Sequence, residues 1–120
     1  PAAVWDAHCR AVQALLDDAD LAAAPFEDRH LGQLPLEEAV DRFYTPDVVM
    51  HTWDLARAAG LDDRLDPEVC GRLLQDMLPF DAVMRASGQY GPRLEAPAGA
   101  GPQEQLLAFI GRDAAWRPPG

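Results

Sequence analysis

The pattern of apolar residues that follows Asp66 constrains the fold more than any other feature of this sequence. Asp66, Pro67 and Glu68 combine an N-cap residue, a first-turn proline and an acid at the positive end of a helix dipole. An apolar seam follows, with steps of four, four, three and four residues: Val69, Leu73, Met77, Phe80 and Met84. This spacing predicts an amphipathic helix. Pro79 predicts a kink or a division of that helix, and Gly88 predicts its end.

Seven-residue spacing predicts another helix at the start of the chain, over about residues 2–19. Trp5, Val12 and Ala19 recur at that interval and define one wide apolar face. Residues 20–34 read as a connector. Their apolar side chains allow a short strand, but we expect no true sheet from them.

Cap signals and helical spacing predict two further helical regions. The first runs over about 35–44 and 46–59, either as two abutting helices or as one helix kinked between them. The second is short, follows a Gly- and Pro-rich loop over 88–101, and is closed by Gly111. We therefore expect one all-α domain over residues 1–120. The residues expected to be largely buried are Val12, Leu15, Trp53, Leu55, Leu73, Met77 and Phe80.

Charge and cysteine usage limit the class of partner and the compartment. Twenty acidic residues against ten basic ones, all arginine, give a net charge of −10. A field of this sign repels nucleic acid and anionic membrane surfaces. The first residues lack the basic-then-apolar order of a signal peptide. Cys9 and Cys70 form no local motif and read as small buried residues. We therefore expect a cytoplasmic protein without nucleic acid or membrane partners.

Three polar residues share one stripe of the otherwise apolar 46–59 helix, which we expect inside a bundle. Asp47, His51 and Asp54 stand at i, i+4 and i+7, within about 60° of the helix circumference. An acid four residues before a histidine lets both side chains bind one metal ion. The alternative is a carboxylate that only orients a buried imidazole. Arg57, one turn after Asp54, also offers Asp54 an ion pair.

Residues 49–60, VMHTWDLARAAG, closely resemble the HxWDLARAxG signature of actinobacterial DinB-like metal-binding proteins. These proteins are relatives of the mycothiol-dependent maleylpyruvate isomerases. The similarity continues through 65–68, 85–92 and 106–113, and residues 1–16 resemble another helix of the family. The resemblance therefore covers nearly the whole chain, and its most specific part is the block around His51.

The resemblance implies a four-helix bundle that holds zinc or nickel. In such proteins an early helix provides a histidine, and a later helix provides an acid and a histidine four residues apart. His51 matches the later histidine and Asp47 matches the acid, while Asp54 would support the site by orienting a ligand. The metal would lower the pKa of a low-molecular-weight thiol, mycothiol, in an isomerase or S-transferase.

The resemblance also implies a first bundle helix with a metal-binding histidine ahead of Pro1, which this sequence does not contain. We therefore expect three bundle helices plus a short C-terminal helix, in a fragment or a short form of such a protein. His8 is the candidate replacement ligand, and a core histidine is the alternative interpretation. His30 is expected to be solvated. The uncovered groove predicts a homodimer or the missing N-terminal segment bound in trans. The alternative function is a non-catalytic helical interaction or dimerisation module without a complete metal site.

Overall fold

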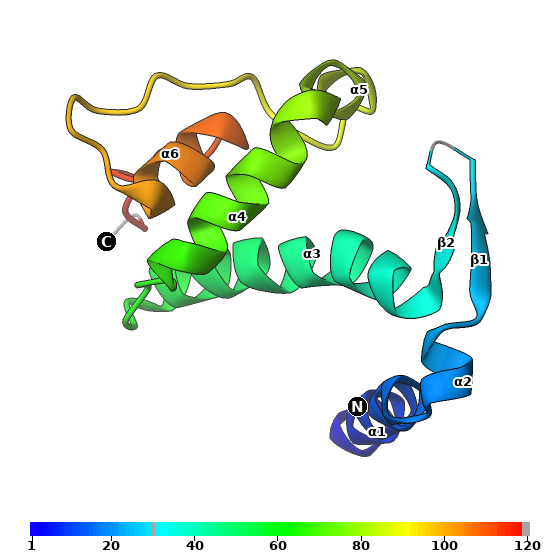
Figure 1. Ribbon diagram of the computed structural model, residues 1–120. Helices are drawn as coiled ribbons and strands as arrows, with labels where there is room; N and C mark the ends of the chain where they lie inside the picture. Colours follow the sequence, from blue (N-terminus) through cyan, green and yellow to red (C-terminus); the bar gives the residue numbers. More distant parts are fainter. Residues whose placement is uncertain (30, 119–120) are drawn as a thin grey trace. The chain divides into compact units, whose positions relative to one another are not determined.

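The computed structural model describes residues 1–29 and 31–118, which are mostly helical with one small antiparallel sheet (Figure 1). The predicted helical class is confirmed at this coarse level. The chain divides into two compact units, Pro1–Val48 and Val49–Gly120, and each is described here by itself. That both units make one DinB-like bundle stays a prediction.

The first unit begins with α1 (Ala2–Asp17) and α2 (Ala19–Ala22). Asp18 separates them because its backbone is extended and its carboxylate accepts two backbone N–H groups of α2. The single helix predicted over 2–19 is therefore two helices. No residue of α1 is buried: Val12 and Leu15, which we expected to be largely buried, are half-buried, and Trp5 is exposed.

A hairpin follows, in which β1 (Pro25–Asp28) pairs with β2 (Gly32–Pro35) in antiparallel register. The expectation of no true sheet is wrong. The Asp28 carboxylate accepts a backbone N–H within the turn at 2.8 Å, and Gly32 has a φ of 72°. These two features reverse the chain direction. The flanking strands are too short to show a clear alternation of apolar and polar residues, so the sequence did not predict them. His30 lies outside the described residues.

The longest helix, α3 (Leu36–Ala59), is continuous and contains Pro46, so the two abutting helices are not formed. Gly60 ends α3 with a φ of 67°, a conformation that favours glycine after a helix. The 46–59 segment, which we expected inside a bundle, is buried along one side and exposed along the other. Its exposed residues include Val48, Thr52, Leu55, Ala58 and Ala59.

The second unit contains α4 (Pro67–Met77), the 3-10 turn η1 (Leu78–Phe80), α5 (Asp81–Ala86) and α6 (Pro102–Phe109). The cap signals are confirmed, because the Asp66 carboxylate accepts the first N–H groups of α4 at 2.8 and 3.3 Å. The division predicted at Pro79 is confirmed by the 3-10 turn that contains it.

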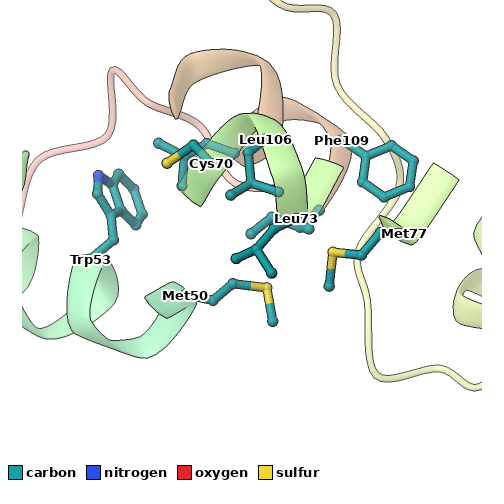
Figure 2. Packing of buried hydrophobic residues seen from close by; sticks show 9 residues of the cluster. Met50, Trp53, Cys70, Leu73, Met77, Leu106 and Phe109 are labelled. Carbon is teal, nitrogen blue, oxygen red and sulfur yellow. The ribbon is translucent and has the colours of Figure 1, made fainter. Parts of the chain in front are cut away.

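Side chains of α3, α4 and α6 meet in the core of the second unit (Figure 2). The buried cluster comprises Met50, Trp53, Cys70, Leu73, Met77, Leu106, Leu107, Phe109 and Ile110. Burial is confirmed for Trp53, Leu73 and Met77 but is wrong for Leu55 and Phe80, which are 71% and 39% exposed. Leu55 lies two residues from Trp53, about 200° around the helix, so it faces away. Phe80 belongs to the 3-10 turn, where the helical period of α4 ends.

The loop between α5 and α6 packs against the end of α6 (Figure 1). Its Leu94 N–H donates to the Ala108 carbonyl at 2.9 Å. Gly111 has a φ of 84°, and a Cβ at this position would lie 2.8 Å from the Pro92 carbonyl oxygen. Glycine is therefore required here both by the backbone conformation and by the close approach of the loop. In the described ranges, no helix combines the length and the apolar character needed to cross a membrane.

Candidate functional site

The second unit places His51 and Asp54 next to each other on the solvent side of α3. His51 Nδ1 lies 3.0 Å from Asp54 Oδ2, and the His51 side chain is 68% exposed. An ionised carboxylate only accepts hydrogen bonds, so Nδ1 must carry the hydrogen in this pair. In the neutral ring, Nε2 is then the nitrogen with a lone pair available to a ligand.

Arg112 fixes Asp54 from the other side. Its Nε and Nη2 atoms donate to Asp54 Oδ1 and Oδ2 at 2.6 and 2.7 Å, which makes a two-point ion pair. The Arg112 backbone N–H donates to the Leu107 carbonyl at 2.8 Å, so the arginine is anchored to the end of α6. The hydrogen bonds from Arg112, and after them the one from His51, lower the pKa of Asp54, although partial burial opposes this shift. Asp54 therefore remains a carboxylate that orients His51.

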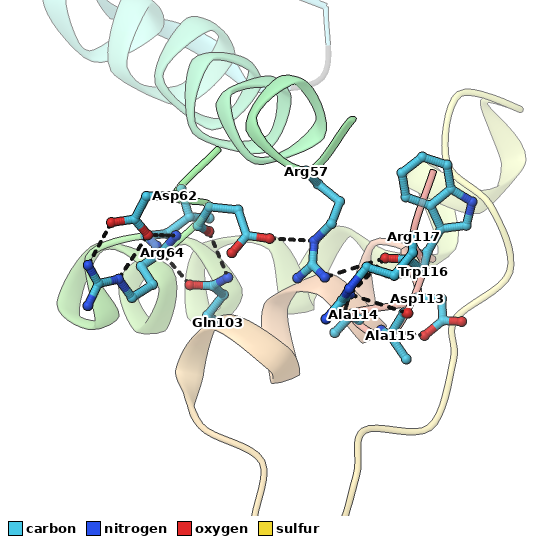
Figure 3. A network of polar contacts seen from close by, with 11 residues as sticks. Arg57, Asp62, Arg64, Gln103, Asp113, Ala114, Ala115, Trp116 and Arg117 are labelled. Atoms are coloured by element: carbon cyan, nitrogen blue, oxygen red, sulfur yellow. Dashed lines mark hydrogen bonds and ion pairs between the residues drawn. The ribbon is translucent and has the colours of Figure 1, made fainter. Parts of the chain in front are cut away.

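Arg57 does not pair with Asp54, so that alternative is wrong. Arg57 forms an ion pair with Asp63, lies over the Trp53 ring at 5.1 Å, and donates to the Trp116 carbonyl at 3.4 Å. Figure 3 shows Arg57 between the loop after α3 and the C-terminal tail. Asp54 instead interacts with Arg112 and His51.

Loop residues after α3 are held by Gln103 of α6. Its side-chain amide donates to the Asp63 carbonyl at 3.0 Å and accepts the Leu65 N–H at 2.8 Å (Figure 3). These bonds satisfy backbone groups of a loop without regular structure. The end of α3 is thereby tied to α6, the helix that also positions Arg112.

The other predicted ligands have different surroundings. Asp47 is exposed on α3, one turn before His51, and belongs to the first unit. His8 is exposed on α1, with its ring centroid 6.2 Å from that of Trp5, so its interpretation as a core histidine is wrong. Across residues 1–29 and 31–118, no group of three or more His, Cys, Asp or Glu side chains is arranged to hold a metal ion.

The two cysteines differ in burial. Cys70 is buried in the core, and this burial, with a contribution from Asp66, raises the pKa of its thiol. Cys70 is therefore a packing residue, as predicted. Cys9 is exposed on α1, so its predicted burial is wrong. Both cysteines are free thiols.

Sequence reasoning missed Arg112 as part of the site. Arg112 and Asp54 are separated by 58 positions, beyond any local spacing rule. Gly111, which precedes Arg112, was predicted only as the end of the last helix. Its positive φ is what turns the chain after α6 and starts the segment that carries Arg112.

Comparison with known proteins gives relatives without an assigned activity. The uncharacterized proteins Rv0738 and MT0763, from two strains of Mycobacterium tuberculosis, are each 33% identical to this chain over 99 residues. The match covers 78% of this chain and 54% of each relative, so the chain spans about half the length of the curated relatives it matches. No protein-family profile matches the chain. No solved structure matches it either.

Proposed function

We propose that this chain is part of a DinB-like protein that binds a divalent metal, zinc or nickel, through His51 and Asp47. The observation that carries the proposal is the arrangement of His51, whose Nδ1 is bonded to Asp54, so that Nε2 is the nitrogen with the lone pair in the neutral ring. Metal-binding histidines typically donate their second ring N–H to a carboxylate in this way. Asp47 is exposed one helical turn before His51, and the spacing of four residues puts it on the same face of α3.

The residues of the chain have separate tasks in this proposal. Asp54 keeps the hydrogen of His51 on Nδ1, and Arg112 keeps Asp54 ionised and in place. A divalent metal held by His51 and Asp47 would lower the pKa of a low-molecular-weight thiol such as mycothiol, which would then be available as a thiolate nucleophile for an isomerase or S-transferase. Catalytic zinc sites normally have three protein ligands and one open position for a thiol or water, and Asp47 and His51 would supply two of those three.

Metal titration of the purified chain tests the proposal. We expect stoichiometric binding of Zn²⁺ or Ni²⁺ by isothermal titration calorimetry, and we expect His51→Ala to abolish it. Asp54→Asn should weaken binding by about 10–100-fold, because the ligand loses its orienting partner. Asp47→Asn should also weaken it, since an amide is a poorer ligand than a carboxylate.

The matched control is His8→Ala, which removes an exposed histidine from the first unit and should leave the affinity unchanged. If His8→Ala abolishes binding as well, the ligand set is different from the one proposed. Absence of stoichiometric binding by the unmodified chain would contradict the proposal and favour the second candidate function.

The second candidate function is a helical dimerisation module, which a different observation favours. Val48, Thr52, Leu55 and Ala59 are exposed on α3 with steps of four, three and four residues. This spacing is typical of the seam along which two helices pack. We propose that a second copy of the chain covers this seam in a two-fold dimer that buries more than about 1,200 Å² in total.

Sedimentation at micromolar concentration tests the dimer. We expect the unmodified chain to sediment as a dimer and Leu55→Glu to sediment as a monomer, because a charge is introduced at the centre of the seam. Gln75→Glu, an exposed position of α4 away from the seam, is the charge-matched control and should remain dimeric. A monomeric unmodified chain would overturn this candidate.

A further inference from the structure

The second unit contains a cavity that is separate from the His51 site. It has a volume of about 460 Å³ and lies between α4, α6 and the loop over 91–100. This volume is within the range of small-molecule binding sites, about 300–1,000 Å³. Its lining includes apolar side chains from all three segments, namely Leu74, Leu78, Leu94, Pro97 and Phe109. The cavity therefore offers an apolar wall to a small ligand.

One cationic side chain, Arg93, lines the same cavity. Its guanidinium carbon lies 5.3 Å from the centroid of the Phe109 ring. This stacking holds the planar guanidinium on the aromatic side chain and leaves its N–H groups for another acceptor. Within residues 1–29 and 31–118, the Arg93 side chain forms no hydrogen bond and no ion pair. Glu95, which lies in the same loop, does not pair with it either.

This state of Arg93 contrasts with that of other arginines in the second unit. Arg85 also lies near the Phe109 ring, at 5.2 Å, but it pairs with Asp81 at 2.9 Å and donates to the Gly91 carbonyl at 2.6 Å. Its charge is thereby matched and its donors are occupied. Arg93 is left as a cation at the cavity without a matching carboxylate from the described chain.

We propose that this cavity binds a small molecule that has an apolar body and one carboxylate group. The apolar body contacts Leu74, Leu78 and Leu94, and the carboxylate accepts hydrogen bonds from Arg93. Among the described residues that line the cavity, Arg93 is the one cation and Gln75 and Gln105 are neutral, so a single negative charge is specified. The net charge of −10 does not prevent this, since charges farther than about 8–10 Å are screened at physiological salt.

Octanoate and 1-octanol are the probes that test the proposal, because they share an apolar chain and differ in charge. Each is titrated into the full chain, and the methyl resonances of Leu74, Leu94 and Leu55 are followed by NMR. We expect octanoate to shift Leu74 and Leu94 and to leave Leu55 unchanged. Arg93→Gln should raise the Kd of octanoate about tenfold or more and change that of octanol less than about twofold.

Further variants make each outcome decisive. Arg10→Gln, an exposed arginine of the first unit, should leave both affinities unchanged. Ala96→Trp, at an exposed position that lines the cavity, should weaken both probes. Arg93→Lys is the second variant if circular dichroism shows that Arg93→Gln is unfolded. It keeps the charge and should retain part of the octanoate affinity.

The proposal is overturned if octanoate fails to shift Leu74 and Leu94, or if Arg93→Gln binds octanoate as the unmodified chain does. Equal loss of octanol and octanoate in a folded Arg93→Gln would also overturn it, because Arg93 would then shape the cavity without recognising charge.

Discussion

Trp53→Ala is expected to lower the free energy of unfolding by about 3–5 kcal/mol, as for other buried aromatic side chains. Trp53 is 4% exposed and belongs to the core cluster of the second unit. Its removal leaves a cavity in this cluster, and the cation–π contact with Arg57 is lost. Urea unfolding followed by circular dichroism measures this loss, because the signal does not depend on the tryptophan that is removed.

The matched control is Leu55→Ala on the same helix. Leu55 is 71% exposed, so its truncation should change the free energy of unfolding of the monomer by less than about 0.5 kcal/mol. A loss below about 1 kcal/mol for Trp53→Ala would mean that this face of α3 is not packed in solution. A large loss for Leu55→Ala at a concentration where the chain is monomeric would mean that the opposite face is packed as well.

Asp54→Asn is expected to destabilise the second unit by about 1–2 kcal/mol near neutral pH, because it removes a two-point ion pair between partly exposed groups. Arg112 and Asp54 are 23% and 34% exposed, which reduces the effect relative to a fully buried pair. A double-mutant cycle with Arg112→Gln separates the pair from the single side chains. A coupling energy near zero would show that the two residues do not meet in solution.

Acid pH provides a second readout of the same ion pair. The pKa of Asp54 is lowered below 3.8 in the folded chain, mainly by the hydrogen bonds from Arg112. A lowered folded pKa contributes stability that is fully present above the unfolded value and is lost as the pH falls through the folded value. The difference in stability between the unmodified chain and Asp54→Asn should therefore shrink below pH 3.8. A difference that grows on acidification would contradict the assignment.

Only part of the candidate site could be predicted from the sequence, because spacing rules relate residues within one helix. His51, Asp47 and Asp54 were selected because i, i+4 and i+7 positions share one side of a helix. Spacing along the helix does not distinguish which of the two acids contacts the imidazole. In the structure the bond is to Asp54, three residues after His51, and Asp54 is in turn held by a residue 58 positions away.

The sequence by itself determined where helices of the second unit begin and end. The signals act through the local backbone. Asp66 caps a helix with its side chain, Pro79 lacks an N–H, and Gly60 adopts a positive φ. Such effects depend on neighbouring residues only, so they can be predicted without the fold. The hairpin after α2 was missed because its pairing requires two short segments to meet across a turn.

Only the tertiary structure decided which faces are buried and which charges are paired. Trp53 and Leu55 are both large and apolar, yet one lies in the core and the other in solvent, because packing by α4 and α6 covers a single stripe of α3. Three arginines have the same side chain but different partners. Arg57 pairs with Asp63, Arg112 pairs with Asp54, and Arg93 lies over an aromatic ring. Burial and ion pairing depend on residues brought together from distant positions, and no local period or spacing encodes those distances.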